Sequence, residues 1–219
     1  ERFPEAVALY QQVLAHRQEL LGADHPRTLG VMNNLADAYR LSGKLADAIP
    51  LWEAAFKQFQ SKLGPDHPNT LTTLNNLATG YRSSGRGSEA LALFEANLRQ
   101  LRNKLGADHP NTLGAMNNLA STYRSTGRLQ ESVEMFQQAR QGFEAKLGPQ
   151  HPNTLMVLFN LGDALLAGKQ YSQSLTLFAQ VRKVAAEALG PEHRITLAAW
   201  KGQANVHAAQ KRWRESLAI

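Results

Sequence analysis

The chain has 219 residues, of which 43% are hydrophobic and none is cysteine. The absence of cysteine excludes disulfide bonds and cysteine-ligated metals and is consistent with a reducing compartment, so we expect a cytoplasmic protein. The formal net charge of +6 mildly favours acidic partners. No apolar run reaches the roughly 18 residues that a membrane-spanning helix needs, so we expect no membrane partner.

The first predicted element is a helix over residues 1–21. Apolar side chains recur there at spacings of three and four residues, which is typical of an amphipathic helix. Gly22 then supplies the residue type that most often ends a helix in the left-handed conformation. Asp24 or His25 is placed to cap a second helix, which should therefore begin directly after them.

The next elements form a helix hairpin. Apolar residues from Leu29 to Tyr39 continue the helical spacing, and a Ser-Gly turn follows them. A longer helix of about 19 residues then runs from Leu45 to Leu63, where the apolar spacing is again helical. Gly64 ends it and the pattern starts again. No stretch alternates with the period of two that predicts a strand, so the fold class is all-α.

The whole pattern recurs with a fixed period of 42 residues. A period of this size is the signature of a stacked repeat array, in which each unit contacts mainly its neighbours. We expect a single array over residues 1–219: the second helix of a truncated repeat (1–24), four repeats (25–66, 67–108, 109–150 and 151–192) and a partial fifth repeat (193–219), whose second helix begins at Lys211, Arg212 and Trp213. The histidines that carry the period are His25, His67, His109, His151 and His193.

Repeat arrays normally end in polar capping units, and neither end of this sequence shows one. We therefore expect a fragment of a longer protein. Its exposed end faces could stack on a neighbouring copy, which predicts end-to-end self-association.

The second repeat carries the residues that resemble a known family. Leu77, Ala78 and Tyr81 are followed by a glycine, by the small Ala90 and by Phe94, an order that resembles the tetratricopeptide repeat (TPR). The period of 42 residues, rather than the usual ~34, is similar to the long repeats of kinesin light chains and of nephrocystin-type and bacterial relatives. This resemblance implies a right-handed superhelical solenoid of antiparallel helix hairpins. In kinesin light chains the first helices line a concave groove that binds extended cargo peptides, and asparagines there bond the peptide backbone.

A helical wheel predicts which residues of this chain face such a groove. The face opposite the apolar stripe of the first helix holds an asparagine in each of the four repeats. A second asparagine and an arginine lie at the edge of this face in three of the repeats. We predict that the following residues bind a peptide: Asn34, Asn76, Asn118, Asn160, Asn33, Asn75, Asn117, Arg40, Arg82, Arg124, Asp37, Thr79, Ser121 and Asp163.

The asparagines are unusual because each costs roughly half a kcal/mol in a helix relative to alanine. An amide side chain both donates and accepts, so a row of them can pair with the backbone of an extended ligand. The alternative is that these asparagines bond a neighbouring helix or its loop, which applies most directly to the edge set of Asn33, Asn75 and Asn117. The sequence leaves both interpretations open.

Arg40, Arg82 and Arg124 occur once in each of three repeats, and a guanidinium can grip a carboxylate through two hydrogen bonds. They predict acidic residues in the ligand. Leu166 replaces them in the fourth repeat, so the acidic part of a ligand would lie along the first three. The alternative is that these arginines only cover apolar surface with their stems.

Other chemistry is not expected. The repeated histidines lie on different repeats, too far apart for zinc, which needs ligands about 2.1 Å away. Asp37 and Asp163 are equally unsuited to act as a catalytic pair. No phosphate loop or nucleophile motif is present, so we predict no enzyme, no metal and no cofactor. The aromatic residues follow the apolar stripes rather than the basic residues, so nucleic acid is not expected either.

The sequence therefore predicts a protein-interaction module that holds an extended, acidic peptide along its first helices. In such a module the chain would form part of a larger scaffold, adaptor or signalling protein. The alternative is an architectural or self-assembling scaffold without a dedicated peptide ligand.

Overall fold

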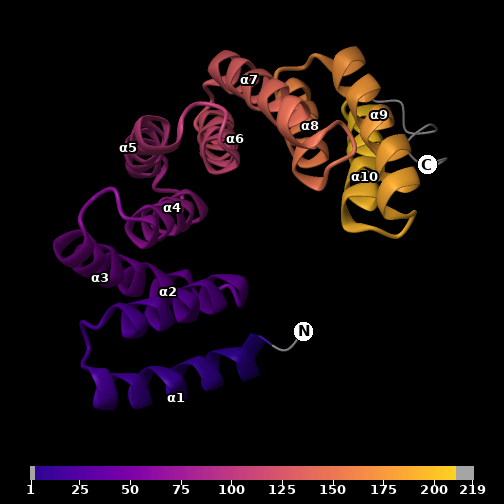
Figure 1. Cartoon of the computed structure of the whole chain (residues 1–219). Coiled ribbons are helices and arrows are strands. Elements are labelled where there is room, and N and C mark those ends of the chain that lie inside the picture. The colour runs from indigo at the N-terminus through magenta and orange to yellow at the C-terminus, as the bar shows by residue number, and fades with distance from the viewer. Residues whose placement is uncertain (1–2, 211–219) are drawn as a thin grey trace. The chain divides into compact units, whose positions relative to one another are not determined.

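The computed structural model describes residues 3–210, and within them it holds ten α-helices and no strand (Figure 1). The predicted second helix of the fifth repeat, at Lys211, Arg212 and Trp213, lies outside the described residues. The all-α prediction is confirmed over the part described. The helices are α1 (Phe3–Leu21), α2 (Pro26–Leu41), α3 (Leu45–Leu63), α4 (Pro68–Ser83), α5 (Gly87–Leu105), α6 (Pro110–Ser125), α7 (Leu129–Leu147), α8 (Pro152–Ala167), α9 (Tyr171–Leu189) and α10 (Arg194–Ala209).

Short and long helices alternate along the chain. Each first helix of a repeat has 16 residues and each second helix has 19. The chain divides into two compact units, residues 1–104 and 105–219. Within the first unit α1 packs on α2, α2 on α3 and α3 on α4, and within the second each helix from α6 to α10 packs on the next. First helices of successive repeats also touch, as α2 and α4 do in one unit and α6 and α8 in the other.

A histidine caps each first helix. In α4 the Nδ1 atom of His67 accepts a hydrogen bond from the backbone N–H of Asn69, 3.2 Å away, and Pro68 is the first helical residue. This bond satisfies one of the backbone donors that a helix start leaves without a partner. The same bond decides between the two caps that the sequence allowed for α2, because His25 accepts from the N–H of Arg27 while the carboxylate of Asp24 pairs with Lys62.

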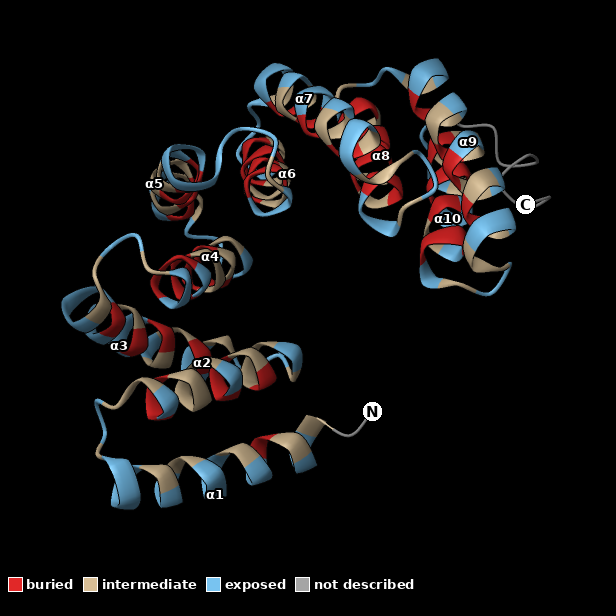
Figure 2. Ribbon diagram, in the orientation of Figure 1, coloured by how far each residue is buried: buried red, intermediate tan, exposed pale blue. Residues whose placement is uncertain are grey.

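The first unit has a core in which α3 lies between α2 and α4. Trp52 is fully buried on α3, and Phe59 packs with Leu29 of α2. Helix α1 contributes less, since Val7 is its one buried residue (Figure 2). The long helices thus bury one face only, as their apolar spacing predicts.

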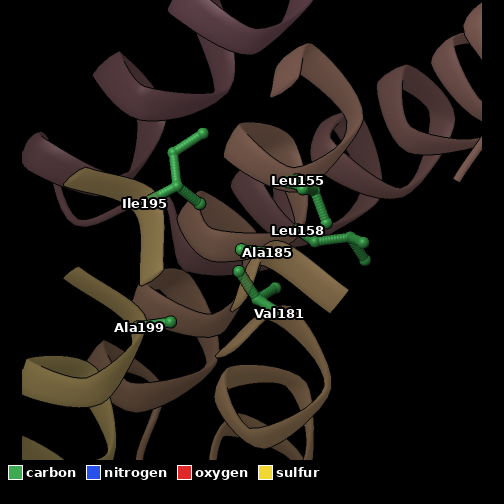
Figure 3. Packing of buried hydrophobic residues seen from close by; sticks show 6 residues of the cluster. All are labelled: Leu155, Leu158, Val181, Ala185, Ile195 and Ala199. Carbon is green, nitrogen blue, oxygen red and sulfur yellow. The ribbon is translucent and has the colours of Figure 1, made fainter. Parts of the chain in front are cut away.

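The core of the second unit joins three helices. Six of its side chains meet where α8, α9 and α10 pack together (Figure 3). Since α9 takes partners from both neighbouring first helices, the interface between repeats is as apolar as the interior of one hairpin. These residues are Leu155 and Leu158 of α8, Val181 and Ala185 of α9, and Ile195 and Ala199 of α10.

Small residues allow the two helices of a hairpin to approach closely. The hydroxyl of Ser132 on α7 donates to the carbonyl oxygen of Ala120 on α6 at 2.7 Å, and Ser174 on α9 donates to that of Gly162 on α8 at 2.8 Å. A side chain reaches the backbone of the partner helix in this way only where the crossing residue is small. The hydrogen bonds also satisfy hydroxyls that are fully buried.

Candidate functional site

The predicted peptide-binding residues all retain contact with solvent. Asn34 is exposed and the other thirteen are half-buried, whereas the opposite face of the first helices is closed by the second helices (Figure 2). We call this set the polar stripe, and each unit carries its own part. In the first unit the polar stripe consists of Asn33, Asn34, Asp37, Arg40, Asn75, Asn76, Thr79 and Arg82, and in the second of Asn117, Asn118, Ser121, Arg124, Asn160 and Asp163.

Asparagine side chains bridge successive first helices. The Nδ2 atom of Asn76 on α4 donates to the Oδ1 atom of Asn33 on α2, 3.2 Å away. In the second unit Asn160 on α8 donates in the same way to Asn117 on α6 at 2.9 Å. Each bond joins the edge asparagine of one repeat to the central asparagine of the next. An amide has two donors and an acceptor with two lone pairs, so a bridge of this kind uses only part of its capacity.

Acidic residues of the polar stripe contact its arginines. Arg40 donates through Nε and Nη2 to Oδ1 of Asp37 on the same helix, at 2.9 and 2.7 Å. In the second unit Nη1 of Arg124 on α6 lies 3.5 Å from Oδ2 of Asp163 on α8. Burial raises the pKa of Asp163, and the charge of Arg124 opposes that rise.

The third arginine of the polar stripe lies against an aromatic ring. The guanidinium of Arg82 is 5.5 Å from the ring centre of Phe94.

The ion pair between Arg124 and Asp163 has a signal in the sequence that the prediction missed. Asp37 and Arg40 occupy two positions of the repeat that are three residues apart. Arg124 and Asp163 occupy the same two positions, but in successive repeats. Ser121 stands three residues before Arg124, and Asp163 is its equivalent one period of 42 residues later. A pair that is local in the first repeat therefore becomes a bridge between repeats in the second unit.

The hydroxyls of the polar stripe are satisfied by their own helices. Thr79 donates to the carbonyl oxygen of Asn75, and Ser121 donates to that of Asn117, both at 2.9 Å. Such bonds to the preceding turn are common for Ser and Thr within helices. These two residues therefore contribute short, neutral surface, and the amides and guanidiniums supply the donors.

Helix α8 changes the chemistry of the stripe. Met156, Phe159 and Leu166 are half-buried on it, and the ring of Phe159 lies 5.4 Å from that of Phe178. Phe159 stands where the second and third repeats carry Asn75 and Asn117. The prediction from recurring polar residues does not include Phe159, although aligning the repeats at their period of 42 residues places it beside Asn75 and Asn117.

No group of three or more histidines and acidic residues within the described part of the chain could hold a metal ion. Of the helices that the structure describes, none is both long and apolar enough to cross a membrane.

The family model of the tetratricopeptide repeat matches residues 1–51, 30–96, 81–145 and 113–187. This chain belongs to the tetratricopeptide repeat family. The family is a scaffold and protein-binding fold rather than an enzyme fold, and its members generally bind protein partners. A search of curated protein sequences gave no match.

Solved structures of TPR proteins resemble this TPR chain over most of its length. A protein of Podospora anserina, assigned as a kinesin light chain with nearly identical TPR-like repeats, is 28% identical, with a TM-score of 0.73, and the match covers 89% of this chain and 92% of that one. BtubC (BKLC) of P. vanneervenii is 17% identical with a TM-score of 0.78, covering 100% and 88%. The apo form of RapI is 14% identical with a TM-score of 0.71, covering 100% and 89%. The last two similarities concern the fold alone.

Proposed function

We propose that this TPR chain binds an extended protein segment along the polar stripe. The observation that carries the proposal is that the stripe stays open to solvent in each of four repeats and carries amides there instead of better helix formers. An extended peptide presents a donor and an acceptor on each residue, and the amide bridges between helices hold their remaining hydrogen-bonding groups at fixed positions. The similarity to kinesin light chain-like repeats is consistent with this mode of binding.

The ligand that fits best is acidic. Arg40 directs two of its five N–H donors to Asp37, so the rest remain for a ligand carboxylate. The ion pair of Arg124 with Asp163 is longer, at 3.5 Å. A carboxylate from a ligand could therefore compete for Arg124 at small cost. Met156 and Leu166 on α8 would receive apolar side chains from the same ligand.

A titration with selected peptides tests the proposal. Selection from a displayed library of random peptides, with this chain as the bait, would first supply a binding sequence. The double variant Asn118→Ala, Asn160→Ala, in which both residues belong to the second unit, should then bind that peptide at least about tenfold more weakly, because two side-chain contacts are lost. The matched control is Asn111→Ala with Asn153→Ala, which removes two exposed asparagines from the first turns of the same helices. Unchanged affinity in the first double variant, with its helix content intact, would exclude the polar stripe as the binding surface.

A second candidate function is self-assembly, in which the chain is an architectural scaffold. Exposed large apolar side chains concentrate on α1 and α10: Leu20 is 65% exposed on α1, and Leu197 and Trp200 are 46% and 40% exposed on α10. One repeat earlier, Leu155 and Leu158 occupy the positions of Leu197 and Trp200, and they are 1% and 2% exposed. Exposed apolar surface of this kind often marks a protein contact.

Sedimentation velocity separates the two candidates. Self-assembly predicts a sedimentation coefficient that rises with protein concentration and falls back in Leu20→Glu or Trp200→Glu. Leu41→Glu is the control, since Leu41 is also exposed, at 48%, but lies on α2. A strict monomer at high concentration would exclude the second candidate and leave peptide binding untouched.

A further inference from the structure

Arg86 is held by three groups at the turn between α4 and α5. Its guanidinium lies 3.8 Å from the ring centre of Tyr81. It also forms a two-bond pair with the carboxylate of Glu89, at 2.7 and 2.5 Å. The third group is Glu53 on α3, whose Oε1 atom lies 3.8 Å from Nη1 of the arginine. The same oxygen accepts a hydrogen bond from the hydroxyl of Tyr81 at 2.7 Å. Stacking on an aromatic ring together with a two-bond grip on a carboxylate is the geometry that suits arginine rather than lysine.

The next repeat contains the same arrangement. Arg128 lies 4.3 Å from the ring centre of Tyr123, and its Nε atom donates to Oε2 of Glu131 at 2.7 Å. The hydrogen bond from the arginine lowers the pKa of Glu131, as the bond from Arg86 lowers the pKa of Glu89. The arrangement is therefore a recurring guanidinium site that the chain fills with its own arginine.

In the first repeat the site is present but the arginine is not. Tyr39 stands in the place of Tyr81, Asp47 in the place of Glu89, and Gln11 in the place of Glu53. The hydroxyl of Tyr39 accepts a hydrogen bond from Gln11 at 2.7 Å, so the ring is held through its hydroxyl, as that of Tyr81 is. Lys44 replaces the arginine, and it is exposed and pairs with no acidic residue in the described part of the chain.

A cleft of about 440 Å³ lies at this position, between α1, α2 and α3. It has the size of many ligand pockets. The three groups that correspond to the arginine site line it together with apolar side chains, which suit the aliphatic stem of an arginine. Six of the lining residues are Gln11, Tyr39, Asp47, Leu14, Leu35 and Leu51.

Two further features of the sequence keep this cleft open and polar. Ala15 lines the cleft where the next repeat has Lys57, which removes a long side chain from it. Pro50 lies within α3 and has no N–H to donate to the carbonyl oxygen of Ala46, and both residues line the cleft. The cleft therefore combines a carboxylate with an acceptor on the backbone, which suits a ligand rich in donors.

We propose that the cleft between α1, α2 and α3 binds the arginine side chain of a partner protein. The guanidinium would stack on Tyr39 and pair with Asp47, in the place that Arg86 and Arg128 occupy in the next two repeats. None of the lining residues belongs to the polar stripe, so this site would act independently of the proposed peptide surface. The partner is a basic segment, in contrast to the acidic ligand of the polar stripe.

The test uses the peptide acetyl-Gly-Arg-Gly-amide and its lysine counterpart as probes in an NMR titration of the full chain. The arginine peptide should shift the amide signals of Tyr39 and Asp47, and the lysine peptide should bind at least about fivefold more weakly, because lysine cannot grip a carboxylate with two parallel bonds. Asp47→Asn should weaken the binding of the arginine peptide. Lys44→Arg should abolish the response, because it supplies the arginine that the later repeats have.

Two controls make the result decisive. Lys57→Arg makes the same substitution within α3, away from the cleft, and should leave the response intact. Arg86→Ala empties the equivalent site of the second repeat and should create a new response at Tyr81. Equal binding of the two peptides, or an unchanged response in Asp47→Asn or Lys44→Arg, would overturn the proposal. So would a response at Tyr81 in Arg86→Ala without any response at Tyr39 in the unmodified chain.

Discussion

The hydroxyl of Thr70 donates a hydrogen bond to the carbonyl oxygen of Gly64, 2.8 Å away. Gly64 follows the last residue of α3 and Thr70 lies in the first turn of α4, so this bond ties the end of one repeat to the start of the next. Thr28 differs, because its hydroxyl meets the carbonyl oxygen of Arg17 at 3.4 Å. The same bond as in Thr70 recurs, at 2.8 to 2.9 Å, from Thr112 to Gly106, from Thr154 to Gly148 and from Thr196 to Gly190.

Replacing Thr70 with valine should therefore destabilise the fold. Valine has the same shape but cannot donate, and the side chain of Thr70 is fully buried. The free energy of unfolding in urea should fall by about 0.5–1.5 kcal/mol, the usual net contribution of one hydrogen bond. Thr70→Ser should retain most of the stability. Thr72→Val is the control on the exposed face of the same helix, and an equal loss there would show that the bond to Gly64 is unimportant.

Two glycines inside first helices should respond in opposite directions to alanine. A Cβ atom added to Gly80 would lie 2.8 Å from Cζ3 of Trp52, which is fully buried, whereas one added to Gly114 would meet nothing within 4 Å. Gly80→Ala should lower stability by about 1–3 kcal/mol through overpacking. Gly114→Ala should raise it by roughly 0.5–1 kcal/mol, because glycine is unfavourable within a helix. Thermal unfolding measures both, and shifts of the same sign would contradict the prediction.

Asn97 is a polar residue in the core of the first unit. It is 1% exposed, and its Oδ1 atom has no hydrogen-bond partner among the described residues. Other repeats carry Ala139 and Val181 at this position, both buried. Asn97→Val should raise the free energy of unfolding by about 1–2 kcal/mol, because an acceptor without a partner is removed from the interior. The matched control is Asn103→Val on the exposed face of α5. A loss of stability in Asn97→Val would indicate that this amide has a role in the native structure.

The helices could be predicted closely because their signals are local. The 19-residue α3 begins and ends at the predicted residues Leu45 and Leu63, since a Ser-Gly turn precedes it and a glycine follows it. The cap of α2 could not be decided from the sequence. Both Asp24 and His25 can accept a hydrogen bond, and the choice depends on backbone angles that place His25, at φ −69° and ψ 138°, directly before the helix.

The contacts of the polar stripe were harder to predict from the sequence. A helical wheel places Asn33 at the edge and Asn34 at the centre of the predicted face, but it contains no information on the offset between successive helices. That offset decides that Asn76 meets Asn33, and that Arg124, whose own helix has no acidic residue, lies within reach of Asp163 in the next repeat. The counterpart of the Arg86 site in the first repeat was equally hard to predict, because it consists of a difference between repeats rather than of residues that recur.

The carboxyl group of Asp163 should make the chain less stable as pH rises. Burial raises its pKa in the folded protein above the value in the unfolded chain, despite the opposing charge of Arg124. The folded state therefore holds the proton more tightly, so this group stabilises the fold at acidic pH. That contribution is lost as pH rises from the unfolded pKa through the folded one. Carbon-13 NMR of the carboxyl group should give a pKa above the ordinary aspartate value, and Arg124→Gln should raise it further.

Urea unfolding of Asp163→Asn measures the same effect on stability. The variant should be more stable than the unmodified chain at neutral pH, where the half-buried carboxylate is charged, and the difference should vanish at acidic pH, where the carboxyl group is neutral. Asp66→Asn is the control, because Asp66 is exposed in the turn before α4. A variant that is less stable than the unmodified chain at neutral pH would mean that the ion pair with Arg124 outweighs the cost of burial, and the sign of the argument would then be wrong.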